Sequence, residues 1–246
     1  MPYDTPHPYD ISPENLEFAM STAVRPDLLR KLVELSRPAF GFFTSSFHHT
    51  INYPWAAAHL ERLPEGSRAL EIGAGLNPLP LFLAERGVFV DCVDGSSIVR
   101  TRPPADDWNE WGYFDYSELH PKLMSYHCDI ANFTPQSAFD VIYSICVIAH
   151  MSRASREDTL RRCRGWLKPG SALLLAIDLI PAGDFLWNRG GGSVEPLLEH
   201  GTIHDVMNLL SELGFVTVEQ TLVRNVPRYS RTELLFIACN LPADSL

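Results

Sequence analysis

The sequence has few cysteines, and their spacing does not suggest a disulfide framework or a zinc site. The five cysteines are scattered over 246 residues without a Cys-x-x-Cys pair: Cys92, Cys128, Cys146, Cys163 and Cys239. Disulfide scaffolds and zinc sites use closely and regularly spaced cysteines. We therefore expect reduced thiols that pack in strands or on helix faces, and no bound metal.

Basic residues are also in deficit. Lys and Arg number 20 against 30 Asp and Glu, which gives a formal net charge of −10. The one basic cluster, "RRCRGWLK" at 161–168, has the spacing of a solvated helix face. A protein that binds a nucleic-acid duplex needs a concentrated basic surface to neutralise phosphates. The composition thus predicts no nucleic-acid partner.

Long hydrophobic runs are absent as well. No window of the sequence is apolar enough to span a bilayer. The first residues, "MPYDTPHPYDISPEN", lack the basic and apolar parts of a secretory signal. These absences predict a cytoplasmic protein with no membrane partner, and they leave its oligomeric state open.

What the sequence does contain is an alternation of strand-like runs and helical patterns. This order is typical of a parallel sheet with helices on both faces. Strands are expected at 68–72, 88–94, 123–130, 139–148 and 171–180, and the runs 214–223 and 232–240 are expected to pair as an antiparallel hairpin. The predicted fold class is α/β, a doubly wound and mostly parallel seven-stranded sheet with an antiparallel C-terminal hairpin and an N-terminal helical extension.

Three helices between these strands have recognisable starts. Asn77 is a good N-cap with Pro78 at the first helical position, and Gly87 ends that helix. A second helix is expected over 152–168, with Ser155 and Asp158 as a capping box and "KPG" as its end. A third is expected to run from Thr202 to Gly214.

Three regions lie outside this alternation. Residues 1–64 are predicted to form a helical extension or lid, with helical pattern from about Pro13 to Leu63. The remaining domain, 65–246, carries inserts near 101–120 and 181–200. The first insert is dense in aromatic residues, which would either wall a pocket or form a small core of their own. The second contains "GGGS" and is either a mobile cover or an ordinary surface loop.

The stretch "ALEIGAGLNPLPLFL", residues 69–83, indicates a nucleotide-binding turn. Two glycines after a strand, Gly73 and Gly75, allow a tight turn and a close approach of backbone N–H groups to a ligand. A dinucleotide fingerprint requires a third glycine where this chain has Pro78. Glu71 adds negative charge at the turn, which disfavours a pyrophosphate. The pattern favours a nucleoside without phosphates.

Two further acidic residues occur at the ends of predicted strands. Asp94 comes 94 − 73 = 21 residues after the first glycine, a spacing suited to an acid that accepts hydrogen bonds from ribose hydroxyls. Asp129 ends the third predicted strand, in "CDI", at the same edge of the sheet. Ligands of open α/β sheets bind at this edge.

In these motifs the chain resembles the class I S-adenosylmethionine-dependent methyltransferases, over about Arg68 to Asn240. "LEIGAG" is similar to the first motif of the family, "VDGS" to the end of its second strand and "CDI" to its adenine-contacting segment. "FDVIYSICVIAHM" and "WLKPGSALLLAID" are similar to its fourth- and fifth-strand signatures. The resemblance implies S-adenosylmethionine as cofactor and transfer of its methyl group to an acceptor.

The resemblance also implies a set of cofactor-binding residues. Glu71, Gly73 and Gly75 would line the methionine and ribose portion, and Asp94, with Ser96 nearby, would bind the ribose hydroxyls. Asp129 and Ile130 would flank adenine, and Ser144 would approach the sulfonium. The chain departs from many members of the family in having Ala149 in place of a glutamate.

Methyl transfer to oxygen or nitrogen is assisted by a general base, and three residues are candidates. His150 follows the fourth predicted strand; the alternative is a histidine that caps or braces the next helix. Asp178 lies near the end of the fifth strand; the alternative is a residue that caps a turn. His49, with His48 beside it, lies in the N-terminal extension, where a surface or packing role is equally compatible.

The predicted function is methyl transfer to a small-molecule acceptor at oxygen or nitrogen. Two alternatives remain at this point. One is an enzyme of the same fold that transfers or cyclises the aminocarboxypropyl arm of the cofactor. The other is a non-catalytic partner protein that keeps the cofactor fold.

Overall fold

The computed structural model describes residues 7–188 and 195–243. Contacts within the chain divide it into two compact units. The first unit comprises residues 1–67 and 73–129, and the second comprises 68–72 and 130–246. The predicted insert near 181–200 is described only in part, and its "GGGS" motif, at 190–193, lies outside the described residues.

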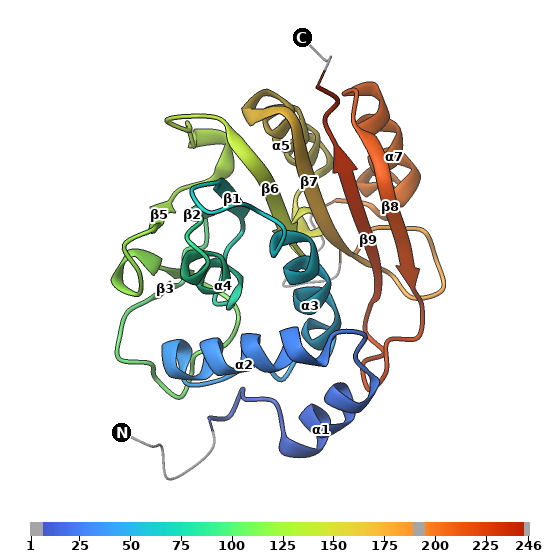
Figure 1. Ribbon diagram of the computed structural model, residues 1–246. Helices are drawn as coiled ribbons and strands as arrows, with labels where there is room; N and C mark the ends of the chain where they lie inside the picture. The colour runs from blue at the N-terminus through green and yellow to red at the C-terminus, as the bar shows by residue number, and fades with distance from the viewer. Residues whose placement is uncertain (1–6, 189–194, 244–246) are drawn as a thin grey trace. The chain divides into compact units, whose positions relative to one another are not determined.

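The first unit contains the N-terminal helices. The expected helical stretch consists of three helices, α1 (Pro13–Thr22), α2 (Pro26–Phe40) and α3 (His49–Leu60). In Figure 1, α2 runs beside α1, α3 and the short helix α4 (Leu79–Glu85). Apolar residues at helical spacing, among them Leu29, Leu32 and Val33, bury one face of α2. The predicted domain boundary at residue 64 stays a prediction.

The strands of the first unit lie in two pairs. Strand β2 (Phe89–Asp94) is parallel to β5 (Leu123–His127). Within the predicted aromatic insert, β3 (Val99–Arg100) is parallel to β4 (Tyr113–Phe114), and the 3-10 turn η1 (Tyr116–Glu118) follows. The insert is therefore ordered by backbone pairing.

The second unit contains five paired strands (Figure 1). Strands β1 (Arg68–Ile72), β6 (Phe139–Ile145) and β7 (Leu167–Leu179) are parallel neighbours. Strand β9 (Glu233–Asn240) lies antiparallel between β7 and β8 (Val216–Val223).

Helices and short turns complete the second unit. Helix α5 (Arg153–Trp166) packs against β7, and α7 (Ile203–Glu212) packs against β8. The short elements are η2 (Ile130–Asn132), η3 (Ile148–His150) and α6 (Leu197–His200).

The strand order of the seven-stranded sheet is β5-β2-β1-β6-β7-β9-β8. The first five strands of this order are expected from the alternation of the sequence, and the antiparallel pair β8–β9 from the two final strand-like runs. Strand β9 is buried from Glu233 to Cys239, whereas β8 is exposed along most of its length because it lies at the edge of the sheet. The predicted fold class is confirmed.

Several predicted boundaries were wrong by a few residues. Helix α4 begins at Leu79, so Pro78 and not Asn77 is the N-cap by backbone geometry. Asn77 still satisfies the helix start, because its Oδ1 accepts a hydrogen bond from the Leu79 N–H over 2.9 Å. Strands β5 and β6 each end three residues earlier than expected, at His127 and Ile145.

The predicted cap and the predicted end of α5 were also wrong. Its N-cap is Ser152, whose Oγ accepts from the Ser155 N–H over 3.2 Å, so Ser155 is not the cap. "KPG" does not end the helix but lies inside β7, which starts at Leu167 because Leu167 pairs with Phe139 of β6. Helix α7 begins after Thr202 as expected, and Thr202 and Asp205 form a capping box at its start.

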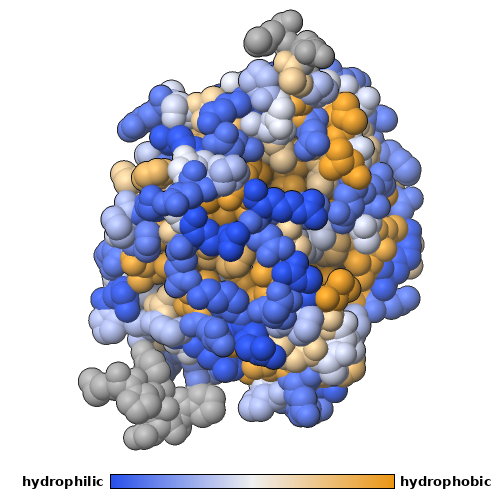
Figure 2. Space-filling view, viewed as in Figure 1, coloured by the Kyte–Doolittle hydropathy of each residue, from blue (hydrophilic) through white to orange (hydrophobic). Residues whose placement is uncertain are grey.

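The exposed surface is mostly hydrophilic on the face that Figure 2 shows. Several orange areas interrupt it. Val216 and Val218 of the edge strand β8 are more than half exposed. Among the described residues, the structure has no helix with the length and hydrophobicity needed to cross a bilayer. None of the five cysteines, all of which lie in the described ranges, is in a disulfide.

Candidate functional site

The paired-glycine turn of the first unit has the backbone conformation that the sequence predicts. Gly73 has a φ of +71° and Gly75 a φ of +49°, both in the left-handed region that favours glycine. The Gly73 N–H donates to the Val93 carbonyl over 2.8 Å, which ties the turn to the end of β2. The turn therefore lies beside the acidic end of that strand.

Asp94 is bonded through both carboxylate oxygens. Its Oδ2 accepts from the Gly75 N–H over 2.9 Å, and its Oδ1 accepts from the Ser96 N–H over 2.7 Å. Each carboxylate oxygen can accept more than one hydrogen bond, so both remain able to accept from a ligand hydroxyl. The structure thus places Gly75, Asp94 and Ser96 together.

Asp129 lies close to the same segment. A Cβ atom on Gly95 would lie 3.2 Å from the Asp129 Cα, so the two backbones approach closely there. His127, at the end of β5, has its Nε2 2.7 Å from the Ser96 carbonyl and stacks on Tyr113 with ring centroids 4.2 Å apart. The acidic end of β2 and the residues after β5 therefore lie side by side within the first unit.

The aromatic insert braces the glycine turn. The Tyr116 hydroxyl accepts from the Asn77 N–H over 2.9 Å and lies 3.0 Å from the Gly75 carbonyl, to which it can donate. The Glu110 carbonyl accepts from the Leu76 N–H over 3.0 Å. The aromatic density of the insert is visible in the sequence, but its bracing of the turn was not predicted. The only signal for it was the position of aromatics in an otherwise polar insert.

Most aromatic rings of the insert form a small core. Trp108, Phe114 and Tyr116 are buried, and Phe114 and Tyr116 each meet Phe40 of α2 edge to face. Trp111 is exposed. For the three buried rings the structure favours packing over a pocket wall.

The donors that a pyrophosphate would use at this turn are already bonded. The Leu79 N–H at the start of α4 donates to the Asn77 side chain, and the Asn77 N–H donates to Tyr116. A phosphate at a helix start needs such N–H groups free. The turn, with a carboxylate beside it and its donors occupied, fits a nucleoside without phosphates.

His49, the third candidate base, is a buried residue at the start of α3. Its Nδ1 lies 3.2 Å from the Asn52 Oδ1, and its ring stacks on Tyr53 at 4.4 Å and 17°. The His48 ring lies 3.9 Å away, centroid to centroid. Its burial excludes a surface position for His49, and the contacts with Asn52 and Tyr53 show that it packs against its own helix.

The remaining predicted cofactor residues belong to the second unit. Glu71 of β1 is buried, and its Oε2 accepts from the Tyr143 hydroxyl over 3.2 Å. The Ser144 hydroxyl donates to the Ile72 carbonyl over 3.1 Å. Ile130 is buried at the start of η2. Ser144 and Glu71 are therefore held on adjacent strands, β6 and β1.

Two of the three candidate catalytic residues meet in this unit. The His150 Nε2 lies 3.7 Å from the Asp178 Oδ2, too far for a hydrogen bond but within ion-pair range for a protonated imidazole. Asp178 is buried near the end of β7, and the His150 side chain is 29% exposed. Strands β6 and β7 are parallel neighbours, which explains why residues after one meet the end of the other.

The residue directly after β6 has a strained backbone conformation. Cys146, directly after β6, has a φ of +58°, an unusual value for a residue with a side chain. Its N–H donates to the Ala176 carbonyl over 2.8 Å, which keeps the strained residue against β7. The turn η3, which ends at His150, follows two residues later.

The methyltransferase domain family matches the chain over residues 70–175. This range contains the paired-glycine turn, Asp94, Asp129 and His150. The resemblance to class I S-adenosylmethionine-dependent methyltransferases is confirmed, and with it the methyltransferase class and the cofactor of this domain.

One curated relative is phosphoethanolamine N-methyltransferase from Plasmodium falciparum, 29% identical over 115 residues. The match covers 46% of this chain but only 40% of that relative's length.

Solved structures show the same fold at low identity. The 1,6-didemethyltoxoflavin-N1-methyltransferase of Burkholderia thailandensis, bound to its acceptor and S-adenosylhomocysteine, is 18% identical with a TM-score of 0.55. That similarity covers 98% of this chain and 92% of the other. Phosphoethanolamine N-methyltransferase 2 of Haemonchus contortus, in complex with S-adenosyl-L-methionine, is 16% identical with a TM-score of 0.54, covering 78% and 52%.

Proposed function

We propose that the protein transfers the methyl group of S-adenosylmethionine to a small-molecule acceptor, at nitrogen or oxygen. The observation that carries the proposal is the Gly75–Asp94 contact at a turn whose other donors are occupied. That arrangement favours adenosine over a phosphorylated nucleotide. A cytoplasmic location, the absence of a nucleic-acid partner and the absence of a membrane partner stay predictions.

The cofactor residues are proposed for the positions that the family pattern assigns. Asp94 would accept hydrogen bonds from the ribose hydroxyls, with Gly73, Gly75 and Ser96 beside it. Asp129 and Ile130 would flank adenine, and Glu71 and Ser144 would line the methionine end. The bound cofactor supplies an electrophilic methyl group on a sulfonium. The protein's task is to align the acceptor and to exclude water.

A nitrogen acceptor is favoured by the relatives. Each of those reported above is an N-methyltransferase by name. An ammonium group must lose a proton before its nitrogen can attack the methyl group. A hydroxyl group loses its proton as its oxygen attacks. The acceptor is thus proposed to be a small amine, with an alcohol or phenol as the second chemical class.

His150 is proposed as the general base and Asp178 as its partner. The Asp178 carboxylate, 3.7 Å from the His150 Nε2, stabilises the imidazolium that forms when His150 takes the acceptor's proton. Asp178 is buried, so its charge acts with little solvent screening. The alternative for His150, bracing of the next helix, predicts a loss of stability instead. His49 is the weaker candidate because it is buried and its Nδ1 and ring are engaged by Asn52 and Tyr53 of α3.

Calorimetric titration with S-adenosylmethionine tests cofactor binding directly. Turnover is then measured with phosphoethanolamine and a panel of small amines and alcohols, and the spent cofactor is identified by mass spectrometry. Formation of S-adenosylhomocysteine would support methyl transfer. Formation of methylthioadenosine would instead indicate transfer or cyclisation of the aminocarboxypropyl arm. Failure to bind the cofactor would favour a non-catalytic partner protein.

A matched pair of histidine variants tests the base. His150→Ala is expected to lower kcat by about 10²–10⁴-fold and to leave cofactor affinity unchanged. His204→Ala is the control, because His204 lies on α7 with its side chain 72% exposed. Normal turnover and pH dependence in His150→Ala would remove His150 from the mechanism.

A further inference from the structure

The backbone on both sides of His150 is held by two buried side chains. The Ala149 carbonyl lies 2.8 Å from the His200 Nε2, and the Met151 carbonyl accepts from the Arg156 Nη1 over 3.3 Å. These are the carbonyl groups of the residues directly before and after His150. The two contacts come from separate elements, α6 and α5.

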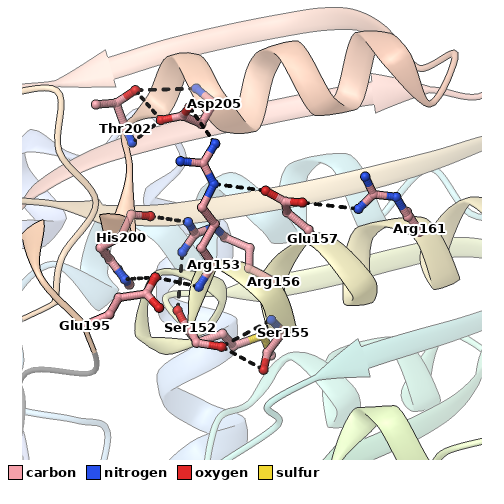
Figure 3. A network of polar contacts seen from close by, with 11 residues as sticks. Ser152, Arg153, Ser155, Arg156, Glu157, Arg161, Glu195, His200, Thr202 and Asp205 are labelled. Atoms are coloured by element: carbon pink, nitrogen blue, oxygen red, sulfur yellow. Dashed lines mark hydrogen bonds and ion pairs between the residues drawn. The ribbon is translucent and has the colours of Figure 1, made fainter. Parts of the chain in front are cut away.

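The two donors are also bonded to each other. The Arg156 Nη2 donates to the His200 carbonyl, and Figure 3 shows the guanidinium lying beside His200. His200 is 0% exposed and Arg156 is 2% exposed. We call this pair the His150 clamp, defined as Arg156 and His200.

Charges around the clamp are arranged to keep both side chains in place. Burial lowers the pKa of the Arg156 guanidinium, and the nearby carboxylate of Glu195 opposes that effect. The Glu195 Oε1 lies 3.4 Å from the His200 Nδ1 and accepts from the Arg153 N–H over 2.7 Å. The Ala149 carbonyl can only accept, so the proton of the imidazole sits on Nε2 in this contact.

Helix initiation alone does not account for the clamp. The start of α5 already has its cap, because the Ser152 side chain accepts from the Ser155 N–H. Among the described residues, the buried Arg156 guanidinium donates to backbone carbonyl groups, and burying a charge with such partners is costly. We therefore expect these contacts to have a role beyond helix initiation. The Ala149 and Met151 carbonyl groups that they fix flank the candidate base, His150.

We propose that Arg156 and His200 are positioning residues that fix the backbone of His150 and so aim its imidazole; the inference rests on the role proposed above for His150. A general base works only within hydrogen-bond reach of the proton it takes. Small displacements of such a group cost much of its effect. With its neighbouring carbonyl groups anchored, His150 keeps one orientation beside Asp178.

Nuclear magnetic resonance of ¹⁵N-histidine-labelled full-length protein tests the clamp without any acceptor. The ring signals of His150 are assigned by their loss in His150→Gln. In the wild type we expect one sharp set of His150 ring signals. In His200→Phe we expect these signals to broaden or to split into several sets. His200→Gln retains an N–H donor and is expected to restore the single set. His204→Phe is the control and should leave the His150 signals unchanged.

The possible outcomes separate the clamp from the proposed function. A folded His200→Phe with wild-type His150 signals overturns the clamp, and so does a His200→Gln variant as perturbed as His200→Phe. If His200→Phe does not fold, Arg156→Lys replaces it, since lysine keeps the charge but lacks the two separate nitrogens with which Arg156 bonds the Met151 and His200 carbonyl groups. Cofactor titration of the same samples reports independently on cofactor binding, so a failure to bind the cofactor leaves the test of the clamp intact.

Discussion

The Gly75 N–H donates to the Asp94 Oδ2 over 2.9 Å, so the turn after β1 and the end of β2 are joined by one charge-assisted hydrogen bond. The other Asp94 oxygen accepts from the Ser96 N–H. One carboxylate therefore orders two backbone segments of the first unit and keeps lone pairs for a ligand. Binding and bracing are expected to depend on the same side chain.

The first prediction concerns Asp94→Ala. Loss of the ribose hydrogen bonds and of the brace on Gly75 is expected to weaken binding of S-adenosylmethionine by about 1–3 kcal/mol, or roughly 5- to 150-fold. Calorimetric titration measures it. Asp106→Ala is the control, an exposed aspartate in the same unit. Wild-type affinity in a folded Asp94→Ala would remove Asp94 from the cofactor site.

The second prediction uses two glycines with positive φ in the first unit. In Gly75→Ala the new Cβ would lie 2.5 Å from the Glu110 carbonyl oxygen, so the turn and the insert must separate. In Gly66→Ala, at φ +84°, nothing lies within 4 Å, so only backbone strain of about 1–3 kcal/mol applies. Thermal unfolding and cofactor titration should show a larger loss of stability for Gly75→Ala, and a loss of affinity in that variant alone. Equal effects of the two substitutions would contradict the close approach.

The third prediction concerns the Tyr116 hydroxyl. Tyr116→Phe leaves the buried Asn77 N–H without its acceptor, which is expected to lower the free energy of unfolding by about 1–3 kcal/mol. Tyr113→Phe is matched in chemistry, because within the described part of the chain the Tyr113 hydroxyl makes no hydrogen bond and its ring stacks on His127. Urea denaturation measures both. A Tyr116→Phe variant as stable as Tyr113→Phe would show that the insert does not brace the turn.

Local sequence signals predicted most of the fold, and the predicted turn and the predicted acidic strand end are in contact through Gly75 and Asp94. The strand at 68–72, the two glycines and Asp94 follow one another closely in sequence, and the roles proposed for them depend on backbone conformation and on the edge of a sheet. Helix ends were less predictable, because Asn77 and Ser155 compete with neighbours that can also cap. Strand β7 extends over "KPG" because its pairing with β6 overrides the local turn signal.

The clamp and the bracing of the turn could not be predicted because they join residues distant in sequence. His200 and Ala149 are 51 residues apart, and Tyr116 and Asn77 are 39 apart. No periodicity or motif in the sequence connects such positions. A lone buried histidine and a lone buried arginine look, in sequence, like any other residue of a helix.

The fourth prediction is a pH dependence of stability that comes from Asp205. The Asp205 carboxylate accepts from the Thr202 N–H over 2.7 Å, and this backbone hydrogen bond is the largest cause that lowers the pKa of Asp205 in the folded protein. In the unfolded chain its pKa is about 3.9. The stabilising contribution is therefore fully present above that value and is lost as the pH falls through the lower, folded-state pKa.

Asp205→Asn should consequently reduce the free energy of unfolding by on the order of 1 kcal/mol at pH 7, because asparagine is a weaker acceptor in the capping box. The difference from wild type is expected to shrink below about pH 4, as Asp205 of the wild type becomes protonated. Urea denaturation at pH 7, 5, 4 and 3 measures it, with Asp106→Asn as an exposed control. A difference that stays constant down to pH 3 would mean that the Asp205 charge does not stabilise the start of α7.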